Sequence, residues 1–258
     1  MSVLRYAIAG AGMMGQEHMR NIALLPDAAI HAVYEPDAAM AAKAAEIAPA
    51  ARMAGSFNDL LGDDKVDCLL IASPNHCHVE QLGAALSAQP QLPILVEKPL
   101  YTGAEDVARL TELSASQPRV WVAMEYRYMP AIAKLIAEAE RATGGIKMLT
   151  IREHRFPFLD KVGNWNRFNR FTGGTLVEKC CHFFDLMRLL LNAEPVRVMA
   201  SAGQSVNHRE ERYGGETPDI WDCGFVIVDF DSGARAMLEL CMYADGSRYQ
   251  EELCAIGP

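Results

Sequence analysis

Three glycines near the start of the chain constrain its fold more than any other feature. Gly10, Gly12 and Gly15 have G-x-G-x-x-G spacing within the segment A-G-A-G-M-M-G. An apolar run over residues 3–8 precedes this loop, and a helix-compatible run follows it. A second apolar run leads to Glu35, which lies 20 residues beyond Gly15 (35 − 15 = 20). The arrangement predicts a strand–loop–helix–strand unit with an acid at the distance of a ribose-binding carboxylate.

Each glycine has its own physical role in such a unit. Gly10 permits a tight turn at the end of the strand, and Gly15 lets the helix pack close to that strand. Gly12 leaves room for a pyrophosphate, which the N–H groups and partial positive charge of the helix N-terminus attract. We therefore predict a dinucleotide site, and the alternative is a glycine-rich turn that binds nothing.

Composition and charge exclude several classes of protein. The chain has 258 residues, half of them hydrophobic, which is typical of a soluble globular protein with two domains. Its formal net charge of −9 argues against nucleic acid or an anionic membrane as a partner. No apolar stretch reaches the roughly 18 residues of a membrane span, and the early first strand leaves no room for a signal peptide. Seven scattered cysteines without a C-x-x-C pair predict a reducing, cytoplasmic environment.

The first half of the chain alternates between predicted strands and helices. Residues 1–125 therefore predict an α/β domain of the Rossmann type, with a doubly wound parallel sheet. The predicted strands cover residues 4–9, 30–34, 66–72, 93–96 and 120–124. The predicted helices cover residues 13–25, 38–47, 56–61, 79–88 and 104–114.

The pattern changes over residues 126–258, for which we predict an α+β domain with an open, mainly antiparallel sheet. Helices are expected over residues 131–141 and 175–192, and strands over residues 148–154, 196–202, 224–230, 234–242 and 249–256. Residues 156–172 are rich in aromatic side chains, Asn and Arg, which favours a functional loop. Because the chain stops at a turn directly after a strand, we expect this domain to be incomplete at its C-terminus.

Loops at the carboxyl ends of the parallel strands are the expected ligand sites. Besides the glycine loop, these are the Pro74-Asn75 loop and the segment Glu97-Lys98-Pro99. Lys98 follows an apolar strand and precedes a proline that restricts its backbone. A lysine in a partly desolvated cleft can donate or relay a proton. The alternative is an ordinary surface lysine after a strand.

The predicted helix over residues 175–192 carries the second group of candidates. Glu178, His182 and Asp185 are spaced four and three apart, which places them within about 60° on one helix face. The other positions are mainly apolar, so these ionisable groups need a cavity or partners. An acid can orient an imidazole, and histidine suits general base catalysis near neutral pH. A satisfied buried pair, an exposed polar stripe and a metal site are alternatives, but no convincing third metal ligand accompanies the pair.

Two further segments carry side chains that suit ligand contact. The loop over residues 163–167 offers an aromatic plane in Trp165 and a guanidinium in Arg167 for a cofactor. Tyr126 and Arg127 begin the second predicted domain. Structural packing is an equally good interpretation of both segments.

Four motifs occur in the order found in one known family. They are A-G-A-G-M-M-G, S-P-N-H-C-H at residues 73–78, E-K-P at residues 97–99, and G-G-T-L-V-E-K-C-C-H-F-F-D at residues 173–185. Over essentially its whole length the chain resembles the family of glucose–fructose oxidoreductase, inositol 2-dehydrogenase and the rhizopine-catabolism protein MocA. The resemblance implies a nucleotide-binding N-terminal domain and a C-terminal domain whose sheet binds substrate on one side. In this family the same sheet often mediates assembly, so the resemblance implies a homodimer or homotetramer.

The resemblance implies roles for individual residues. The family's catalytic lysine and histidine correspond to Lys98 and His182. The acid four residues before the histidine, commonly Asp, is Glu178 here, and we expect it to be the third catalytic residue. Its side chain reaches one methylene further than Asp. The implied reaction is hydride transfer between a secondary alcohol of a sugar, polyol or inositol and a nicotinamide cofactor, and Glu35 favours NAD over NADP. Two other possibilities on the same scaffold are glycoside cleavage through transient oxidation by NAD, and a non-catalytic sensor of nucleotide or sugar.

The residue patterns and the resemblance together give two sets of ligand-binding residues, and without a convincing third ligand we expect no metal site. The cofactor set comprises Gly10, Gly12, Met13, Met14, Gly15, Glu35, Pro74, Asn75, His78, Glu97, Lys98, Trp165 and Arg167. The substrate set comprises Lys98, Tyr126, Arg127, Glu178, His182 and Asp185.

Overall fold

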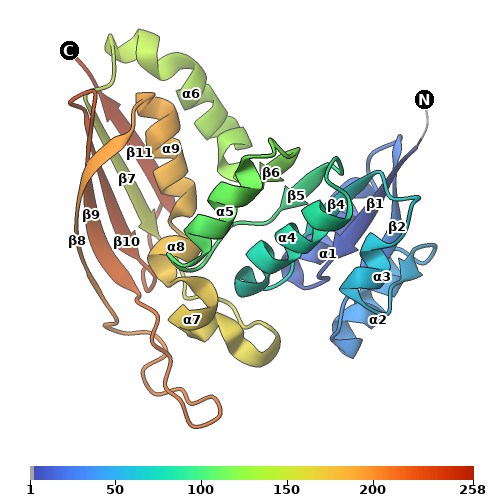
Figure 1. Ribbon diagram of the computed structural model, residues 1–258. Helices are drawn as coiled ribbons and strands as arrows, with labels where there is room; N and C mark the ends of the chain where they lie inside the picture. Colours follow the sequence, from blue (N-terminus) through green and yellow to red (C-terminus); the bar gives the residue numbers. More distant parts are fainter. Residues whose placement is uncertain (1–2) are drawn as a thin grey trace. The chain divides into compact units, whose positions relative to one another are not determined.

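The computed structural model describes residues 3–258 (Figure 1). The chain divides into two compact units. The first contains the chain up to Ala123 together with Lys161–Trp165, and the second contains Met124–Asp160 and Asn166–Pro258. A short segment from the later part of the sequence therefore belongs to the first unit.

The first unit is built on a six-stranded parallel sheet with the strand order β3-β2-β1-β4-β5-β6. The order reverses direction at β1, so that β2 and β4 flank it. The carboxyl end of β1, where the glycine loop begins, is thus the switch point at which such sheets bind ligands. The strands are β1 (Leu4–Ala9), β2 (Ala28–Tyr34), β3 (Arg52–Met53), β4 (Cys68–Ile71), β5 (Ile94–Val96) and β6 (Val120–Val122).

Helices pack on both faces of this sheet, which confirms the predicted doubly wound arrangement. One core cluster joins Met19 of α1 and Ala44 of α2 to the strands, and a second joins Leu60 of α3 and Leu82 of α4 to the opposite face. The helices are α1 (Met13–Ile22), α2 (Ala38–Ile47), α3 (Phe57–Leu61), α4 (His78–Ala88) and α5 (Asp106–Ser114), with the short 3₁₀ helix η1 (Asn75–Cys77).

Element boundaries in the first unit differ from the prediction by a few residues. Helix α1 ends at Ile22, three residues before the predicted end at Leu25. Pro26 follows, and a residue before proline is disfavoured in the helical conformation. The two-residue strand β3 was not predicted, because its length gives no period to detect.

The second unit contains a five-stranded sheet with the order β11-β7-β10-β9-β8. Strands β7 and β10 pair in parallel, and the other pairings within the described residues are antiparallel, which confirms a mainly antiparallel sheet. Helices α6 (Pro130–Thr143) and α9 (Cys181–Leu191) cover one face (Figure 1), with side chains of both in one core cluster with the strands. The strands are β7 (Met148–His154), β8 (Pro195–Gly203), β9 (Cys223–Phe230), β10 (Arg235–Cys241) and β11 (Glu251–Ile256).

The single long helix predicted over residues 175–192 is wrong, because the chain forms two helices there. Helix α8 (Thr175–Glu178) ends before Lys179, and α9 (Cys181–Leu191) begins after Cys180. Cys180 has φ −88° and ψ −3°, at the edge of the right-handed helical region, and its carbonyl accepts bonds from the N–H groups of Phe183 and Phe184. Glu178 and His182 therefore lie on different helices, and the one-face argument holds only for His182 and Asp185.

The remaining helical segments of the second half are short, apart from α6. They are η2 (Glu125–Tyr128), α6 (Pro130–Thr143), η3 (Val162–Arg167) and α7 (Asn169–Thr172), the last two within the predicted loop. Within residues 3–258, no helix combines the length and apolar character that crossing a membrane requires.

Candidate functional site

The glycine loop has the geometry of a phosphate cradle. Gly10 has a φ of +93°, and a Cβ atom there would lie 2.6 Å from the carbonyl oxygen of Ala72 in the loop after β4. A Cβ atom on Gly15 would overlap the carbonyl oxygen of Gly10. By contrast, no heavy atom lies within 4 Å of the Cβ position of Gly12. Gly10 and Gly15 are thus required for packing, whereas Gly12 leaves open space at the N-terminus of α1, which fits a pyrophosphate.

The carboxylate of Glu35 lies at this loop. Its Oε2 accepts a hydrogen bond of 2.6 Å from the N–H of Ala11, and its Oε1 accepts one of 2.9 Å from the N–H of Asp37. Strand β2 ends just before Glu35, which brings the acid beside the carboxyl end of β1. The predicted distance of 20 residues thus corresponds to direct contact between acid and loop.

Residues after β4 and β5 form the next part of the site. His78 is fully buried, with Nδ1 2.8 Å from the carbonyl oxygen of Pro99 and Nε2 3.0 Å from that of Ser73. Burial lowers the pKa of His78, and the two carbonyl contacts oppose that shift. His78 therefore ties the loop after β4 to the loop after β5, beside Lys98, and its contact with a cofactor stays a prediction.

Glu97 is also buried and joins β5 to α1. Its Oε1 lies 2.7 Å from Nε2 of His18, and its Oε2 accepts a bond of 3.2 Å from the N–H of Lys98. Burial alone would raise the pKa of Glu97, but the bond with His18 and the charge of Lys98 lower it overall. No role could be predicted for His18 from the sequence, because its partner is 79 residues away.

This pair leads to a prediction about stability. Because the pKa of Glu97 is lowered in the folded protein, its charge stabilises the fold above the ordinary value of 4.5, and the contribution is lost as the pH falls through the lowered pKa. Glu97→Gln should therefore reduce the free energy of unfolding by about 1–3 kcal/mol at pH 7 and by progressively less below pH 4.5. Urea unfolding over a pH series measures this difference. The exposed Glu112→Gln is the control, and a difference that does not depend on pH would contradict the interpretation.

Lys98 is half-buried, and its two neighbours in the chain, Glu97 and Pro99, are buried.

The Pro74-Asn75 loop leads into the short helix η1, in which Asn75 is buried. Trp165 belongs to the first unit, and its ring meets that of His76 edge to face, with the centroids 6.2 Å apart. The structure thus places the predicted Trp165 segment beside the loop after β4.

In the second unit His182 lies in the first turn of α9 and is 2% exposed. Its Nε2 lies 3.4 Å from Oε1 of Glu125, and its ring stacks on the ring of Tyr126 with a centroid distance of 4.2 Å and an interplanar angle of 9°. Glu178, in α8, is 4% exposed. The sequence predicted neither contact of His182, because both partners lie in η2, more than 50 residues earlier in the chain.

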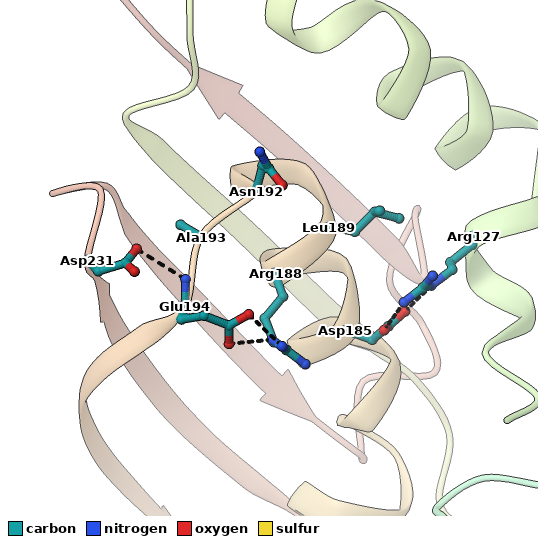
Figure 2. A pocket seen from close by; sticks show the side chains of 8 residues that line it. All are labelled: Arg127, Asp185, Arg188, Leu189, Asn192, Ala193, Glu194 and Asp231. Carbon is teal, nitrogen blue, oxygen red and sulfur yellow. Dashed lines mark hydrogen bonds and ion pairs between the residues drawn. The ribbon is translucent and has the colours of Figure 1, made fainter. Parts of the chain in front are cut away.

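Arg127 and Asp185, both predicted substrate ligands, bind each other. Nε of Arg127 donates to Oδ2 of Asp185 at 2.6 Å, and a second bond joins Nη2 to Oδ1, which raises the pKa of Arg127. The pair lines an open pocket of about 370 Å³, in which Arg188 binds Glu194 in the same two-bonded manner (Figure 2). Each arginine of the pocket thus already faces a carboxylate.

Arg167, predicted as a cofactor ligand, is 2% exposed. Its Nη2 donates to Asp160 at 2.7 Å, and its Nε lies 3.4 Å from Glu211. A cofactor contact by Arg167 stays a prediction, and it would require Arg167 to exchange these partners for the cofactor.

Met13 and Met14, which were also predicted as cofactor ligands, form the first turn of α1, next to Gly12.

Two family models match the chain, each over one part of it. The model described as "Oxidoreductase family, NAD-binding Rossmann fold" matches residues 4–126. The model described as "Oxidoreductase family, C-terminal alpha/beta domain" matches residues 139–254.

Two of the similar curated proteins are named inositol 2-dehydrogenase. The protein from Corynebacterium glutamicum (strain R) is 35% identical over 199 residues, which cover 76% of this chain and 56% of that relative. The protein from Acidothermus cellulolyticus is 28% identical over 242 residues, which cover 93% of this chain and 66% of that relative. The chain thus spans between 56% and 66% of the length of these two relatives.

Solved structures show the same fold. The myo-inositol dehydrogenase of Corynebacterium glutamicum aligns with a TM-score of 0.82 at 23% identity, covering 99% of this chain and 73% of that one. The myo-inositol dehydrogenase of Lactobacillus casei, in complex with NAD(H) and myo-inositol, aligns with a TM-score of 0.80 at 21% identity, covering 99% and 72%. With its glycine cradle, its order of motifs and both domain models matched in sequence, the chain belongs to the Gfo/Idh/MocA family of oxidoreductases, which have an NAD-binding Rossmann domain.

Proposed function

We propose that this protein is an NAD-dependent dehydrogenase that oxidises a secondary alcohol of an inositol or a closely related polyol or sugar. The observation that carries the proposal is the cradle at Gly12, which is open and lies next to the Glu35 carboxylate. The 35% identical relative is named inositol 2-dehydrogenase, which supports the class of substrate.

The first unit holds the groups that would bind NAD. The backbone at Gly12 and the N-terminus of α1 would hold the pyrophosphate, and the Glu35 carboxylate would accept hydrogen bonds from the adenosine ribose hydroxyls. When bound, NAD supplies a hydride acceptor in its nicotinamide ring. Lys98 and Asn75 follow neighbouring strands, at the carboxyl edge of the sheet where such ligands bind.

His182 and Lys98 share the proton chemistry in this proposal. His182 takes the proton of the hydroxyl that is oxidised, which suits an imidazole held in one orientation and shielded from water. Lys98 supplies a positive charge that stabilises the developing alkoxide. In the reverse direction the same groups return a proton to the reduced carbonyl. Glu178, 4% exposed in α8, is proposed as a ligand of substrate hydroxyls.

A screen for NAD reduction tests the proposal. The protein is incubated with NAD and with separate inositols, aldoses, sugar acids and glycosides, and NADH is followed by its absorbance. We expect stoichiometric NADH with at least one inositol or free sugar. Cleavage of a glycoside without net NADH, or binding of NAD without turnover of any of these alcohols, would contradict the proposal.

Replacement of Glu35 tests the proposed ribose contact. Hydrogen bonds to a charged group are worth about 1.5–3 kcal/mol, so Glu35→Ala should weaken NAD binding by about 10-fold or more. It should also narrow the preference for NAD over NADP, because the carboxylate repels a 2′-phosphate. Fluorescence titration with both cofactors measures the two dissociation constants.

Glu35→Gln is the matched control for this variant. Its amide oxygen still accepts from the N–H of Ala11 but carries no charge, so the loop keeps its bond while the repulsion of NADP disappears. We expect a smaller preference for NAD over NADP in both Glu35→Ala and Glu35→Gln. A wild-type protein that already prefers NADP would show that the role assigned to Glu35 is wrong.

A further inference from the structure

A charged side chain lies on the helix-covered face of the sheet in the second unit. In β7, Leu149, Ile151 and Glu153 alternate with more exposed residues and share one side of the strand. All three are buried, with Glu153 at 0% exposure. A carboxylate in line with two core aliphatic side chains is costly unless cations neutralise it.

Two cations and a second carboxylate complete the cluster. Nζ of Lys179 lies 3.0 Å from Oε1 of Glu153, and Nη1 of Arg155 lies 3.5 Å from the same atom. Glu251 of β11 is paired directly opposite Glu153, and Nζ of Lys179 is 4.0 Å from its Oε1. Burial raises the pKa of Glu153 and lowers that of Lys179, and their pairing opposes both shifts. With two carboxylates and two cations, the cluster is electrically balanced.

The cluster is attached to the helix that carries His182. Lys179 lies in the two-residue break between α8 and α9, three residues before His182. Its side chain is 7% exposed and reaches the strands β7 and β11 through the two glutamates. The ion pairs therefore connect the start of α9 to the sheet.

Tyr126 connects this cluster to the imidazole. Its hydroxyl donates to Oε1 of Glu251 at 2.7 Å and accepts a bond of 2.6 Å from Nζ of Lys179. Burial raises the pKa of Tyr126, so the hydroxyl keeps its proton. The phenol oxygen is thus held from two sides, and the ring that it fixes is the one stacked on His182 at 4.2 Å.

We propose that Tyr126 is a positioning residue for His182. Its ring, held at the hydroxyl by Lys179 and Glu251, fixes the plane of the imidazole that takes the substrate proton. The inference rests on the proposed function, in which His182 is the general base, and it gives Tyr126 a different role from the substrate contact expected from the resemblance. Small errors in the orientation of a catalytic group reduce turnover strongly, which explains why a charged cluster is kept in a core.

Kinetics of two Tyr126 variants test the inference. Tyr126→Leu removes the ring, and kcat should fall by about 10- to 100-fold while the KM for NAD and for the alcohol changes little. Tyr126→Phe keeps the ring and loses the anchor, so a smaller fall of about 3- to 10-fold is expected. Tyr128→Leu, an exposed tyrosine in the same 3₁₀ helix, is the control.

A spectroscopic measurement tests the same contact without turnover. The protein has seven histidines, and the Hε1 signal of His182 is identified by its loss in His182→Ala. A ring stacked on the imidazole shifts this signal upfield. We expect it to move downfield in Tyr126→Leu and to move downfield by less in Tyr126→Phe, which keeps the ring but loses its anchor, with the other histidine signals unchanged.

The outcomes separate this inference from the proposed function. If the wild type makes no NADH, or if His182→Ala remains active, the proposed function is wrong, and the histidine spectrum still tests the stack. If His182→Ala is inactive but Tyr126→Leu has the wild-type kcat, the inference is wrong. If Tyr126→Leu does not fold, Tyr126→Phe alone tests the inference. A wild-type kcat in Tyr126→Phe would then show that the inference is wrong.

Discussion

His182→Ala and Lys98→Ala are each expected to lower kcat by about 100-fold or more, the usual scale for acid–base groups. His182 is 2% exposed, so water has little access to replace the imidazole as a base. Lys98 is placed by its buried neighbours Glu97 and Pro99, and alanine there removes the charge that stabilises the alkoxide. Steady-state kinetics with the alcohol found in the screen measure both effects.

The affinity for NAD distinguishes loss of the chemical step from general damage to the protein. The proposed contacts of the cofactor pyrophosphate and ribose are at Gly12 and Glu35, so both alanine variants should bind NAD nearly as the wild type does. His154→Ala removes a histidine whose Nε2 pairs with Glu239 at 2.7 Å, and Lys134→Ala removes an exposed lysine of α6. These two controls should turn over normally. Near-normal turnover in both His182→Ala and Lys98→Ala would show that the proposed mechanism is wrong.

The features predicted correctly from the sequence depend on local geometry. The spacing of the glycine loop, the acid after β2 and the apolar strands each follow from short-range periods that a sequence displays directly. Helix ends were predictable where a side chain or glycine marks them. Ser56 accepts a bond of 3.0 Å from the N–H of Asp59 at the start of α3, and Gly144 ends α6 with a φ of +67°.

The partners of the candidate residues could not be predicted in this way. His182 stacks on a ring 56 residues earlier in the chain (182 − 126 = 56), and Glu97 binds a histidine 79 residues away. These contacts depend on how strands and helices pack, which no local period specifies. A signal for Glu153 was nevertheless present, because it has the same parity as Leu149 and Ile151 in β7 and so had to face the core.

The broken helix shows a second limit of sequence periods. A period of 3.6 residues places Glu178 beside His182 only if the helix is continuous. Lys179 and Cys180 interrupt the helix. At this break Lys179 forms an ion pair with Glu153 of strand β7. The period therefore identified the segment that carries the candidate residues but not the geometry between them.

Gly12→Val is expected to weaken NAD binding by at least about 100-fold, because several hydrogen bonds to a charged pyrophosphate are lost together. The structure itself leaves room for the new side chain. No heavy atom lies within 4 Å of the Cβ position, and the backbone at φ −66° and ψ −164° suits any residue. Valine is a poorer N-cap than glycine, so the free energy of unfolding should fall by only about 1 kcal/mol or less. Calorimetric titration and urea unfolding measure the two quantities.

Gly15→Ala is the matched contrast within the same loop. Its added methyl group would overlap the carbonyl oxygen of Gly10, so we expect a loss of about 1–3 kcal/mol in stability, as for overpacking of a core. The two glycines thus separate ligand binding from folding: the Gly12 variant should be stable but unable to bind NAD tightly, and the Gly15 variant should be destabilised. If Gly12→Val binds NAD as tightly as the wild type, the pyrophosphate does not lie on this backbone, and the proposed cofactor site is wrong.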